Sequence, residues 1–469
     1  MNGSDILKLG YRPGKVVGLA LAAAEAALAA GVSEEDVRST LVNVLNLPDS
    51  YRDDPIYGPV AAMLISQRSK RPDYELEIAA PYRVWGSDIE PEAMEQMKRA
   101  VRLPVAVRGA LMPDAHQGYG LPIGGVLATV NSVIPYAVGV DIACRMRMTV
   151  FDVSPYVLEQ KREMFRRVLE DNTRFGTGAA WSVHQEHEVM DDPAWRELPI
   201  ARQLKDKAWE QLGTSGSGNH FVEFGALTVY SEIDTSLGKV APGKYLALLS
   251  HSGSRRLGME IANHYTDIAM RQRSGLPKDF RHLAWLDLDQ EAGAEYWAAM
   301  QLAGKYASAN HAVIHRRIIE ALRMPVLGGI ENHHNFAWKE LVDGQELIVH
   351  RKGATPAGEN VLGIIPGSMS APGYVVRGLG NPESLSSAAH GAGRRMSRGQ
   401  AKRTFDWDNV KRKLKQEGVE LISAGLDEAP GAYKDIRQVM ADQADLVVAL
   451  AEFQPKLVKM ASGNERPED

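Results

Sequence analysis

The chain contains almost no cysteine: Cys144 is the only one among its 469 residues. A single thiol excludes an internal disulfide. The start of the chain has no basic stretch followed by an apolar core, so we expect no secretory signal and a cytoplasmic protein. The longest apolar run there, residues 16–32, is rich in alanine and includes Glu25 and Gly31. Such a run predicts a soluble helix, and we expect no membrane-spanning segment.

The sequence also lacks a strong excess of either charge. Its formal net charge is -5 at pH 7, with 44% hydrophobic and 24% charged residues. This composition is typical of a soluble enzyme with about two to four domains, and it excludes fibrous and disordered classes. The weak negative charge neither supports nor excludes RNA as a partner, because a local basic groove can bind phosphates against it.

The first part of the chain predicts a helical extension. Apolar periodicity indicates helices over residues 16–30 and 33–45, the second opened by Ser33 with acidic residues in its first turn. Mixed, basic and proline-interrupted sequence follows, which is typical of a linker. We therefore assign residues 1–80 to an N-terminal helical extension and linker.

Residues 81–462 predict a mixed α and β body, because strand-like runs alternate with helical periodicity. A polar tail, residues 463–469, follows and is expected to fray. The clearest strand patterns cover residues 126–130 and 146–150, and the clearest helical patterns cover residues 154–169 and 289–307.

Cys144 follows Asp141 by three residues, which places a soft and a hard metal ligand within one turn of chain. Because the sequence has no other cysteine, this one suggests a chemical role for its thiol. A lone cysteine on an apolar strand is nevertheless more often a small buried hydrophobe, and from these two residues alone that alternative stays open.

Five glycine-rich clusters each adjoin a histidine or polar residues. Glycine lets backbone amides approach phosphate oxygens closely, and neighbouring Ser, Asn and Arg add donors, so these clusters suit a site for phosphate esters. One cluster alone would be weak evidence, because such loops are common in enzymes. The clusters are residues 112–125, 213–223, 251–258, 366–370 and 390–398.

Histidines recur in these clusters. His220, His251 and His390 lie in glycine-rich loops, and His334 follows His333 directly before an asparagine. Together with the Asp and Cys above, they form a plausible N, O and S ligand set for one or two divalent ions. Zinc and manganese both accept such a set, and the sequence does not choose between them.

Several of these motifs occur together in one order: Asp-Ile-x-Cys, Gly-Asn-His-Phe with a glutamate two residues on, and His-Gly-Ala-Gly-Arg followed by Met-Ser-Arg. From about Tyr82 to Lys459 the chain resembles the RtcB family of GTP-dependent RNA splicing ligases. The resemblance implies an α+β class, an RtcB-like mixed sheet fold with a deep metal- and nucleotide-binding cleft. The quoted motifs are residues 141–144, 218–223 and 390–398, and residues 351–355 and 428–435 also resemble the family.

The resemblance implies an enzyme that joins RNA ends carrying a 2',3'-cyclic phosphate or 3'-phosphate to 5'-hydroxyl ends, in RNA splicing, tRNA maturation or RNA repair. His390 would take GMP from GTP, and the GMP would pass to the RNA 3'-phosphate before the 5'-hydroxyl displaces it. Two alternatives remain, a metal-dependent cyclic-phosphate phosphoesterase without ligation and a non-catalytic RNA-binding homologue. An archease-like activator is a possible partner, and the oligomeric state is left open.

The resemblance also carries residue roles. The expected ligands of two Mn²⁺ ions, with the thiolate shared, are Asp141, Cys144, His220, His251 and His334. The expected GTP/GMP-binding residues are Asn219, Phe221, Glu223, Ser368, Gly391, Ala392, Gly393, Tyr433 and Lys459, with Glu223 and Lys459 on the guanine edge. The expected RNA-phosphate contacts are Arg255, Arg394 and Arg398.

Four departures from the family pattern stand out. Gly373 replaces a serine that many members carry in the guanine site, which would loosen guanine selectivity. Ten residues follow Lys459, whereas the family lysine is almost terminal. Arg145 stands directly after Cys144, where glycine is common, and is expected to narrow the space beside the metals. The helical extension is the fourth, and its composition does not reveal a role.

Overall fold

A computed structural model describes residues 1–11, 13–69, 76, 78–463 and 465. Its chain contacts define two compact units, residues 1–75 with 273–276 and residues 76–272 with 277–469. Part of the expected linker, residues 70–75 and 77, lies outside the described residues, as does most of the expected polar tail, residues 464 and 466–469. Among the described residues, no helix combines the length and the apolar character needed to span a membrane.

The first unit is helical. Ser33 accepts a hydrogen bond from the Asp36 amide at 3.2 Å and so caps the second predicted helix. Val37, Leu41 and Val44 lie on its buried face. Within the stretch that we expected to be linker, a further helix begins at Gly58, because the apolar residues that follow pack into this same core. The helices are α1 (Gly3–Lys8), α2 (Lys15–Ala29), α3 (Glu34–Asn46) and α4 (Gly58–Ser69), with the 3₁₀ turn η1 (Pro48–Tyr51).

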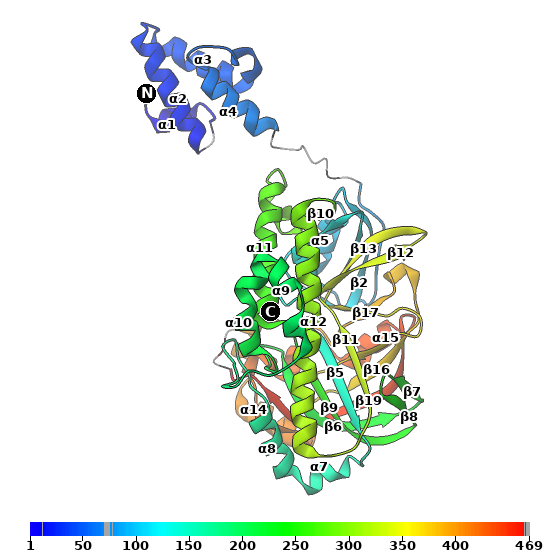
Figure 1. Ribbon diagram of the computed structural model, residues 1–469. Coiled ribbons are helices and arrows are strands. Elements are labelled where there is room, and N and C mark those ends of the chain that lie inside the picture. The colour runs from blue at the N-terminus through cyan, green and yellow to red at the C-terminus, as the bar shows by residue number, and fades with distance from the viewer. Residues whose placement is uncertain (12, 70–75, 77, 464, 466–469) are drawn as a thin grey trace. The chain divides into compact units, whose positions relative to one another are not determined.

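The second unit contains two main sheets (Figure 1). The five-stranded sheet has the order β1 (Tyr82–Val84), β2 (Ala106–His116), β3 (Ile123–Thr129), β13 (Gln345–Lys352), β12 (Phe336–Val342). The larger sheet has the order β11 (Val326–His333), β5 (Arg145–Phe151), β9 (Gly243–Ser252), β6 (Phe221–Val229), β19 (Val447–Met460), β16 (Gly373–Gly378), β15 (Leu362–Ile365), with β18 (Glu420–Ser423) beside β19.

The remaining strands pair into short two-stranded sheets of their own. They are β4 (Ser132–Val133) with β10 (Leu286–Asp287), β14 (Ala354–Pro356) with β17 (Ser387–Ala389), and β7 (Ile233–Thr235) with β8 (Gly238–Val240). The strands are mixed in direction, since β1 pairs parallel with β2 and β18 parallel with β19, whereas the other main pairings are antiparallel.

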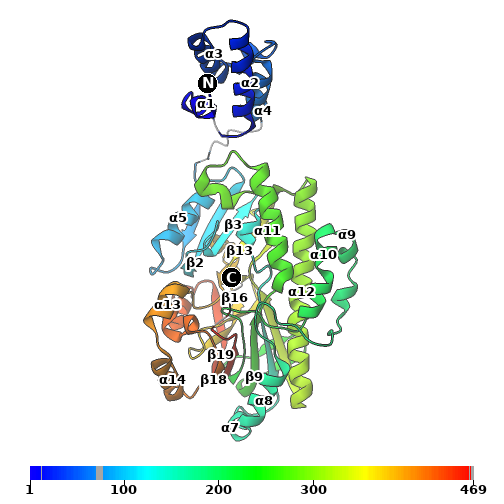
Figure 2. The ribbon, with the colours of Figure 1, turned by 90° about the vertical axis from the view of Figure 1, so that its left-hand side faces the viewer.

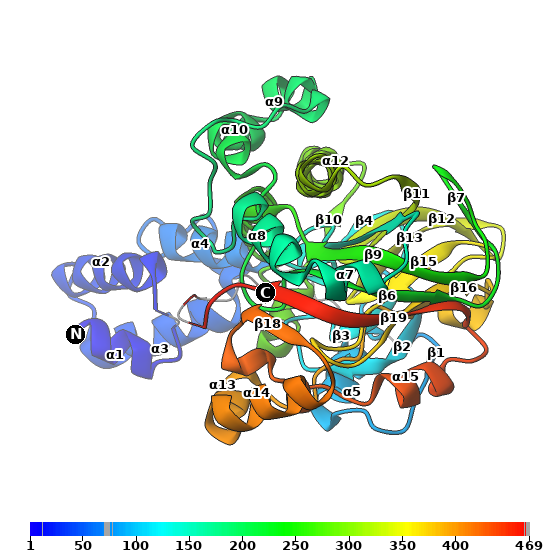
Figure 3. The same cartoon turned by 90° about the horizontal axis from the view of Figure 1, so that it is seen from below.

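Helices cover both sides of the larger sheet. The long helix α12 lies across one face and is seen end-on in Figure 3, while α13 and α14 lie on the other side (Figures 2 and 3). The helices are α5 (Pro91–Ala100), α6 (Pro135–Val138), α7 (Tyr156–Gln160), α8 (Arg162–Asn172), α9 (Ala194–Glu197), α10 (Pro199–Gln211), α11 (Arg255–Gln272), α12 (Glu291–Leu322), α13 (Arg398–Thr404), α14 (Trp407–Gln416) and α15 (Ile436–Asp442). The 3₁₀ turns are η2 (Glu188–Asp191), η3 (Lys278–Leu283), η4 (Pro382–Ser384), η5 (Leu426–Glu428) and η6 (Pro430–Ala432).

Strand alternation in the larger sheet separates a core face from a cavity face. On β6, Val222 and Phe224 pack with Ile314 and Ile318 of α12 in one hydrophobic cluster. The intervening Glu223 points to the opposite face and lines a cavity. The expected α+β class with mixed sheets is confirmed, and the four best predicted elements correspond to β3, β5, α7–α8 and α12.

Candidate functional site

A cavity of about 380 Å³ lies in the second unit and collects most of the predicted site residues. Segments from β2, β6, β9, β16 and β19 and from the loops after β11 and β17 line it. Among the predicted metal ligands and the predicted nucleophile, Asp141, Cys144, His251, His334 and His390 are lining residues. Residues more than 200 positions apart in the sequence therefore meet in one space.

The Cys144 thiol sits in a tight turn between α6 and β5. The Cys144 amide donates to the Asp141 carbonyl at 3.2 Å, and Ala143 between them has a left-handed backbone with φ 56°. Ala143 N–H donates to the Asn335 carbonyl at 2.8 Å, and His334 N–H donates to the Cys144 carbonyl at 2.9 Å. These bonds tie the turn to the end of β11 and hold its unusual conformation in place.

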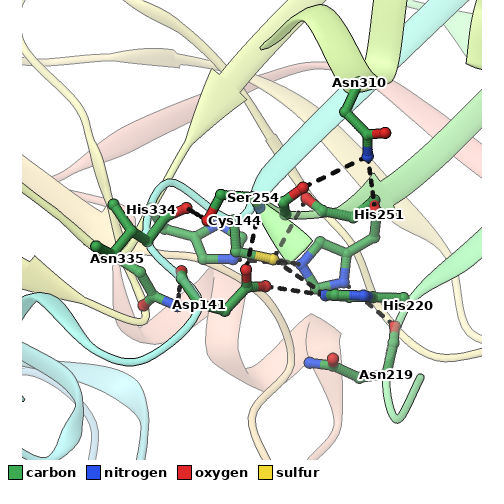
Figure 4. A network of polar contacts seen from close by, with 12 residues as sticks. Asp141, Cys144, Asn219, His220, His251, Ser254, Asn310, His334 and Asn335 are labelled. Carbon is green, nitrogen blue, oxygen red and sulfur yellow. Dashed lines mark hydrogen bonds and ion pairs between the residues drawn. The ribbon is translucent and has the colours of Figure 1, made fainter. Parts of the chain in front are cut away.

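Sulfur and imidazole nitrogens converge beside this turn (Figure 4). Cys144 Sγ lies 3.0 Å from His251 Nε2 and 3.4 Å from His220 Nε2. His251 Nε2 is 3.3 Å from His334 Nε2, and His220 Nε2 is 3.1 Å from Asp141 Oδ2. All five side chains are buried. Several atoms with lone pairs thus lie within hydrogen-bond distance of one another, with few hydrogens between them. Such an arrangement is typical of a cation site.

Burial sets the charge state of these rings. Desolvation lowers the pKa of His251 to about 3 and that of His334 well below its usual value. Burial opposes ionisation of Asp141, but the His220 hydrogen bond and nearby charge lower the pKa of that carboxyl overall. Neutral imidazoles and an ionised carboxylate are the forms that bind metal ions.

His390 lies next to this cluster and is oriented by a buried acid. Its ring is 4.8 Å from the His334 ring, nearly edge-on. His390 Nδ1 lies 2.7 Å from Asp114 Oδ2, which also accepts the His390 and Gly391 amides at 3.1 and 3.3 Å. Because the carboxylate accepts a hydrogen bond from Nδ1–H, the neutral ring carries its lone pair on the opposite nitrogen, Nε2.

Asp114 received no role from the sequence, although it lies in the first glycine-rich cluster, residues 112–125. It lies on β2, fully buried, and its second oxygen, Oδ1, has no hydrogen-bond partner among the described residues. The sequence did offer one indication of its role, an acidic residue within an apolar strand pattern. Such a residue predicts a buried carboxylate, and a buried carboxylate needs a polar partner.

The structure brings most, but not all, of the predicted nucleotide residues to the cavity. Ser368 Oγ accepts from the Ala371 amide at 3.2 Å and so caps its own turn. The predicted residues that line the cavity are Asn219, Phe221, Glu223, Ser368, Gly391, Ala392, Gly393 and Tyr433.

Lys459 does not reach the cavity. Its Nζ donates to the Leu169 and Glu170 carbonyls, at 3.1 and 3.3 Å, near the end of α8. The amine also lies 5.7 Å from the centre of the Phe175 ring. The structure thus differs from the expectation that Lys459 stands on the guanine edge.

Two of the three predicted RNA-binding arginines line the cavity, and both pair with acids. Arg394 contacts the Glu428 carboxylate at 3.5 Å, and Arg398 lies 3.1 Å from the Asp427 carboxylate and also pairs with Glu428. Tyr433 donates its hydroxyl to Glu428 as well. Burial first, and the Glu428 charge second, raise the pKa of the Tyr433 phenol well above its usual value.

Arg255 points elsewhere. Its side chain is 3% exposed, and its Nε donates to Thr214 Oγ1 at 3.2 Å while another guanidinium nitrogen donates to the Gly176 carbonyl. It begins α11 just after the His251 loop, and the helix start turns it away from the cavity. Closeness in sequence to His251 therefore did not place it in the same site.

Arg145 does not narrow the metal cluster as we expected. Its guanidinium pairs with Glu331, which Arg147 also contacts at 2.7 Å, and it is not among the residues lining the cavity. Alternation along β5 turns it to the side opposite the Cys144 thiol. His333 likewise packs against aromatic rings, 5.1 Å from both Phe336 and Trp338.

Lys352 is a second cavity residue that sequence reasoning did not assign. Its Nζ donates to the Tyr136 carbonyl at 3.0 Å and to the Tyr119 carbonyl. Burial lowers the pKa of this amine to about 7. The motif that contains it, residues 351–355, was noted only as a family resemblance.

Comparison with known proteins adds an independent line of evidence. The family model described as "tRNA-splicing ligase RtcB" matches residues 96–460. The chain is 34% identical over 403 residues to an RNA-splicing ligase RtcB of Escherichia coli K12, covering 78% of this chain and 94% of that protein. It is 30% identical over 469 residues to a tRNA-splicing ligase RtcB of Thermococcus kodakarensis, covering 82% of this chain and 95% of that protein.

Proposed function

The chain belongs to the RtcB family of RNA-splicing ligases, and on that premise we propose that it joins RNA ends bearing a 2',3'-cyclic phosphate or 3'-phosphate to 5'-hydroxyl ends, using GTP and manganese. The observation that carries the proposal is His390, oriented by Asp114 and lying edge-on to His334 in the same cavity as the Cys and His cluster.

The five residues of the Cys and His cluster are the proposed ligands of two divalent ions. Cys144, His220 and His251 present ligand atoms within 4.8 Å of one another, and His334 and Asp141 contact this set. The five residues would hold the ions, and a carboxylate with imidazoles and one thiolate suits manganese. When bound, manganese would neutralise phosphate oxygens of the nucleotide and help to orient the reacting phosphorus.

His390 is the proposed nucleophile. Its Nε2 lone pair attacks the α-phosphorus of GTP, the bond to the β-phosphate oxygen breaks, and pyrophosphate leaves. Asp114 accepts a hydrogen bond from His390 Nδ1–H throughout and, as a carboxylate, stabilises the positive charge that develops on the ring. A phosphoramidate is a good donor of GMP because the ring departs as a neutral imidazole once it is protonated.

RNA then takes the GMP. A 3'-phosphate oxygen attacks the phosphorus held by His390, the P–N bond breaks, and the RNA end carries a diphosphate-linked guanosine. The 5'-hydroxyl attacks the RNA phosphorus, GMP leaves, and a phosphodiester forms. A cyclic phosphate would first be opened by water to a 3'-phosphate. Arg394 and Arg398 on the cavity wall are the proposed phosphate contacts, since their planar guanidinium groups match phosphate.

All residues with a proposed role lie within residues 81–462, which supports the proposal that these form the catalytic domain. The RNA substrate class is defined by its end chemistry, because no sequence-specific base contact enters the mechanism.

The test is a set of RNA strands that differ only at their ends. We expect joining of 3'-phosphate and 2',3'-cyclic phosphate ends to 5'-hydroxyl ends, and none with 3'-hydroxyl or 5'-phosphate ends. His390→Ala should abolish joining, while His264→Ala, at an exposed histidine on α11, should not. Opening of the cyclic phosphate without any joining would instead identify a phosphoesterase and overturn the proposal.

A further inference from the structure

The long helix α12 carries three strongly polar side chains among its buried residues, which are otherwise mostly apolar. These three are Asn310, His311 and His315, and each is at most 1% exposed. Their neighbours Ile314 and Ile318 pack with strands of the larger sheet in a hydrophobic cluster. Buried polar groups are costly unless hydrogen bonds satisfy them, so the partners of the three residues show what they hold together.

Asn310 joins two backbone segments that lie far apart in the sequence (Figure 4). Its Oδ1 accepts the amides of Gly213 and Thr214 at 2.7 and 3.2 Å. Its Nδ2 donates to the Thr214 carbonyl at 2.9 Å, and also to Ser252 Oγ and the Gly253 carbonyl at 3.3 and 3.4 Å. One carboxamide thus connects both segments.

Each of these two anchor segments, residues 213–214 and 252–253, adjoins a proposed metal ligand. The first begins the glycine-rich loop that leads to His220, and the second directly follows His251. The anchor segments need an acceptor for two amides and a donor for two carbonyls at the same place, and a carboxamide supplies both. An aliphatic side chain of similar size supplies neither.

His311 and His315 add a hydrogen-bond chain with a fixed direction. Burial lowers the pKa of both imidazoles well below the usual value, so each neutral ring has one donor and one acceptor. His311 Nε2 donates to the Ser252 carbonyl at 3.0 Å, because a carbonyl only accepts. His311 Nδ1 then accepts from Ser250 Oγ at 2.7 Å, and Ser250 Oγ accepts from His315 Nε2 at 2.8 Å. Thr149 Oγ1 completes the chain by donating to His315 Nδ1 at 2.7 Å.

This chain holds β9 on both sides of a proposed ligand. Ser250 and Ser252 flank His251 along the strand and point to the face opposite it, since side chains alternate. All four ring nitrogens of the two histidines on α12 are used within the chain. The side of β9 that faces away from the cavity is therefore fixed by α12.

We propose that Asn310 and His311 are positioning residues for the metal site. Through them, α12 fixes the backbone segments that carry His220 and His251, and so keeps both imidazoles at the distances from Cys144 that a shared ion needs. Glycine-rich loops leave backbone freedom that such anchors remove. This inference rests on the proposed function, because it takes the Cys and His cluster to bind manganese.

The expected effect is weaker binding of the metal rather than its loss. Residues that orient metal ligands without touching the ion typically change affinity by about 10- to 100-fold. Asn310→Leu keeps the approximate size of the side chain but removes every bond to the anchor segments. It should raise the Kd for Mn²⁺ by about 10- to 100-fold.

His311 offers a conservative rescue. His311→Leu removes the donor to the Ser252 carbonyl and should likewise raise the Kd for Mn²⁺ by about tenfold or more. His311→Gln keeps an amide donor within reach of that carbonyl, and it should recover most of the affinity that His311→Leu loses.

Equilibrium binding of Mn²⁺ to the full-length protein, followed by the electron paramagnetic resonance of the free ion, tests the inference. Tyr306→Phe is the matched control. Tyr306 lies one turn earlier on α12, is buried, and donates its hydroxyl to the Ala208 carbonyl at 2.7 Å rather than to an anchor segment. The control should lower the free energy of unfolding and leave the Kd for Mn²⁺ unchanged.

The contrary results are distinct. A folded Asn310→Leu protein with a Kd within about twofold of wild type, or an equal loss of affinity in Tyr306→Phe, would overturn the inference. Should Asn310→Leu not fold, the His311 pair decides alone, and equal affinities of His311→Leu and His311→Gln would overturn it. A wild-type protein that binds no Mn²⁺ would overturn the proposed function itself.

Discussion

Asp114→Asn isolates the electrostatic contribution of the acid behind His390. Asp114 Oδ2 accepts three hydrogen bonds, from the His390 ring and from the His390 and Gly391 amides, and Oδ1 has no hydrogen-bond partner among the described residues. An asparagine can place its carbonyl oxygen at the Oδ2 position and its amide nitrogen at the Oδ1 position. The three hydrogen bonds and the ring orientation can then persist, and only the negative charge is lost.

The size of the effect follows from that difference. A hydrogen bond to a charged group contributes about 1.5–3 kcal/mol, against about 1 kcal/mol for a neutral one. Because the ring becomes positively charged as His390 attacks phosphorus, losing this difference of about 0.5–2 kcal/mol should slow nucleotide transfer to the protein by about 2- to 30-fold. The substrate half-saturation concentration should change little, since Asp114 is not expected to touch the nucleotide.

Single-turnover labelling with α-labelled GTP measures this rate directly. Asp445→Asn is a matched control. Asp445 also accepts a hydrogen bond from a ring N–H, that of Trp85, at 3.0 Å, and it is not among the residues that line the cavity. It should label at the wild-type rate. A rate for Asp114→Asn within twofold of wild type would refute the role given to the Asp114 charge, and complete loss of labelling with loss of folding would show a structural role instead.

Two further substitutions test the placement of predicted residues. Cys144→Ser should weaken manganese binding by about 100-fold or more, because a serine hydroxyl does not ionise as the thiol does when it binds a metal ion. The unfolding curve measured without metal should stay close to that of the wild type. An unchanged manganese content after dialysis would contradict the assignment of Cys144 as a shared metal ligand. Arg255→Ala should lower the free energy of unfolding by about 2–4 kcal/mol, since it removes buried bonds to Thr214 and Gly176. A raised RNA half-saturation concentration with unchanged stability would show that Arg255 contacts RNA instead.

Much of the site could be predicted because its chemistry is carried by short local motifs. Asp141 and Cys144 are three residues apart, and His220, His251 and His390 each stand in a glycine-rich loop, so these local motifs can be recognised without knowing the fold. Their convergence could be inferred only from the family resemblance. Strand order and pairing depend on contacts between distant segments, which local periodicity does not encode.

The residues that sequence reasoning misplaced or overlooked depend on structure beyond their local sequence, in three different ways. On a strand, a shift of one position moves a side chain to the other face, so Lys459 and Arg145 could not be placed without the register of their strands. Arg255 was misplaced because the first turn of a helix rotates neighbouring side chains in different directions. Asp114 was overlooked because its partner, His390, is 276 positions away.

The extension was predicted in outline. Two of its helices follow from amphipathic periodicity and the Ser33 cap, whereas α4 was taken for linker because its apolar residues give only a weak helical pattern. That segment becomes a helix by packing into the core of the first unit.

The most direct measurement is the position of the nucleotide on the protein after incubation with α-labelled GTP and manganese. We predict an acid-labile, alkali-stable adduct on the peptide that contains His390, absent from His390→Ala, and chased into RNA when a 3'-phosphate strand is added. A label on a lysine, a label that persists in His390→Ala, or RNA joining without any labelled protein would contradict the mechanism.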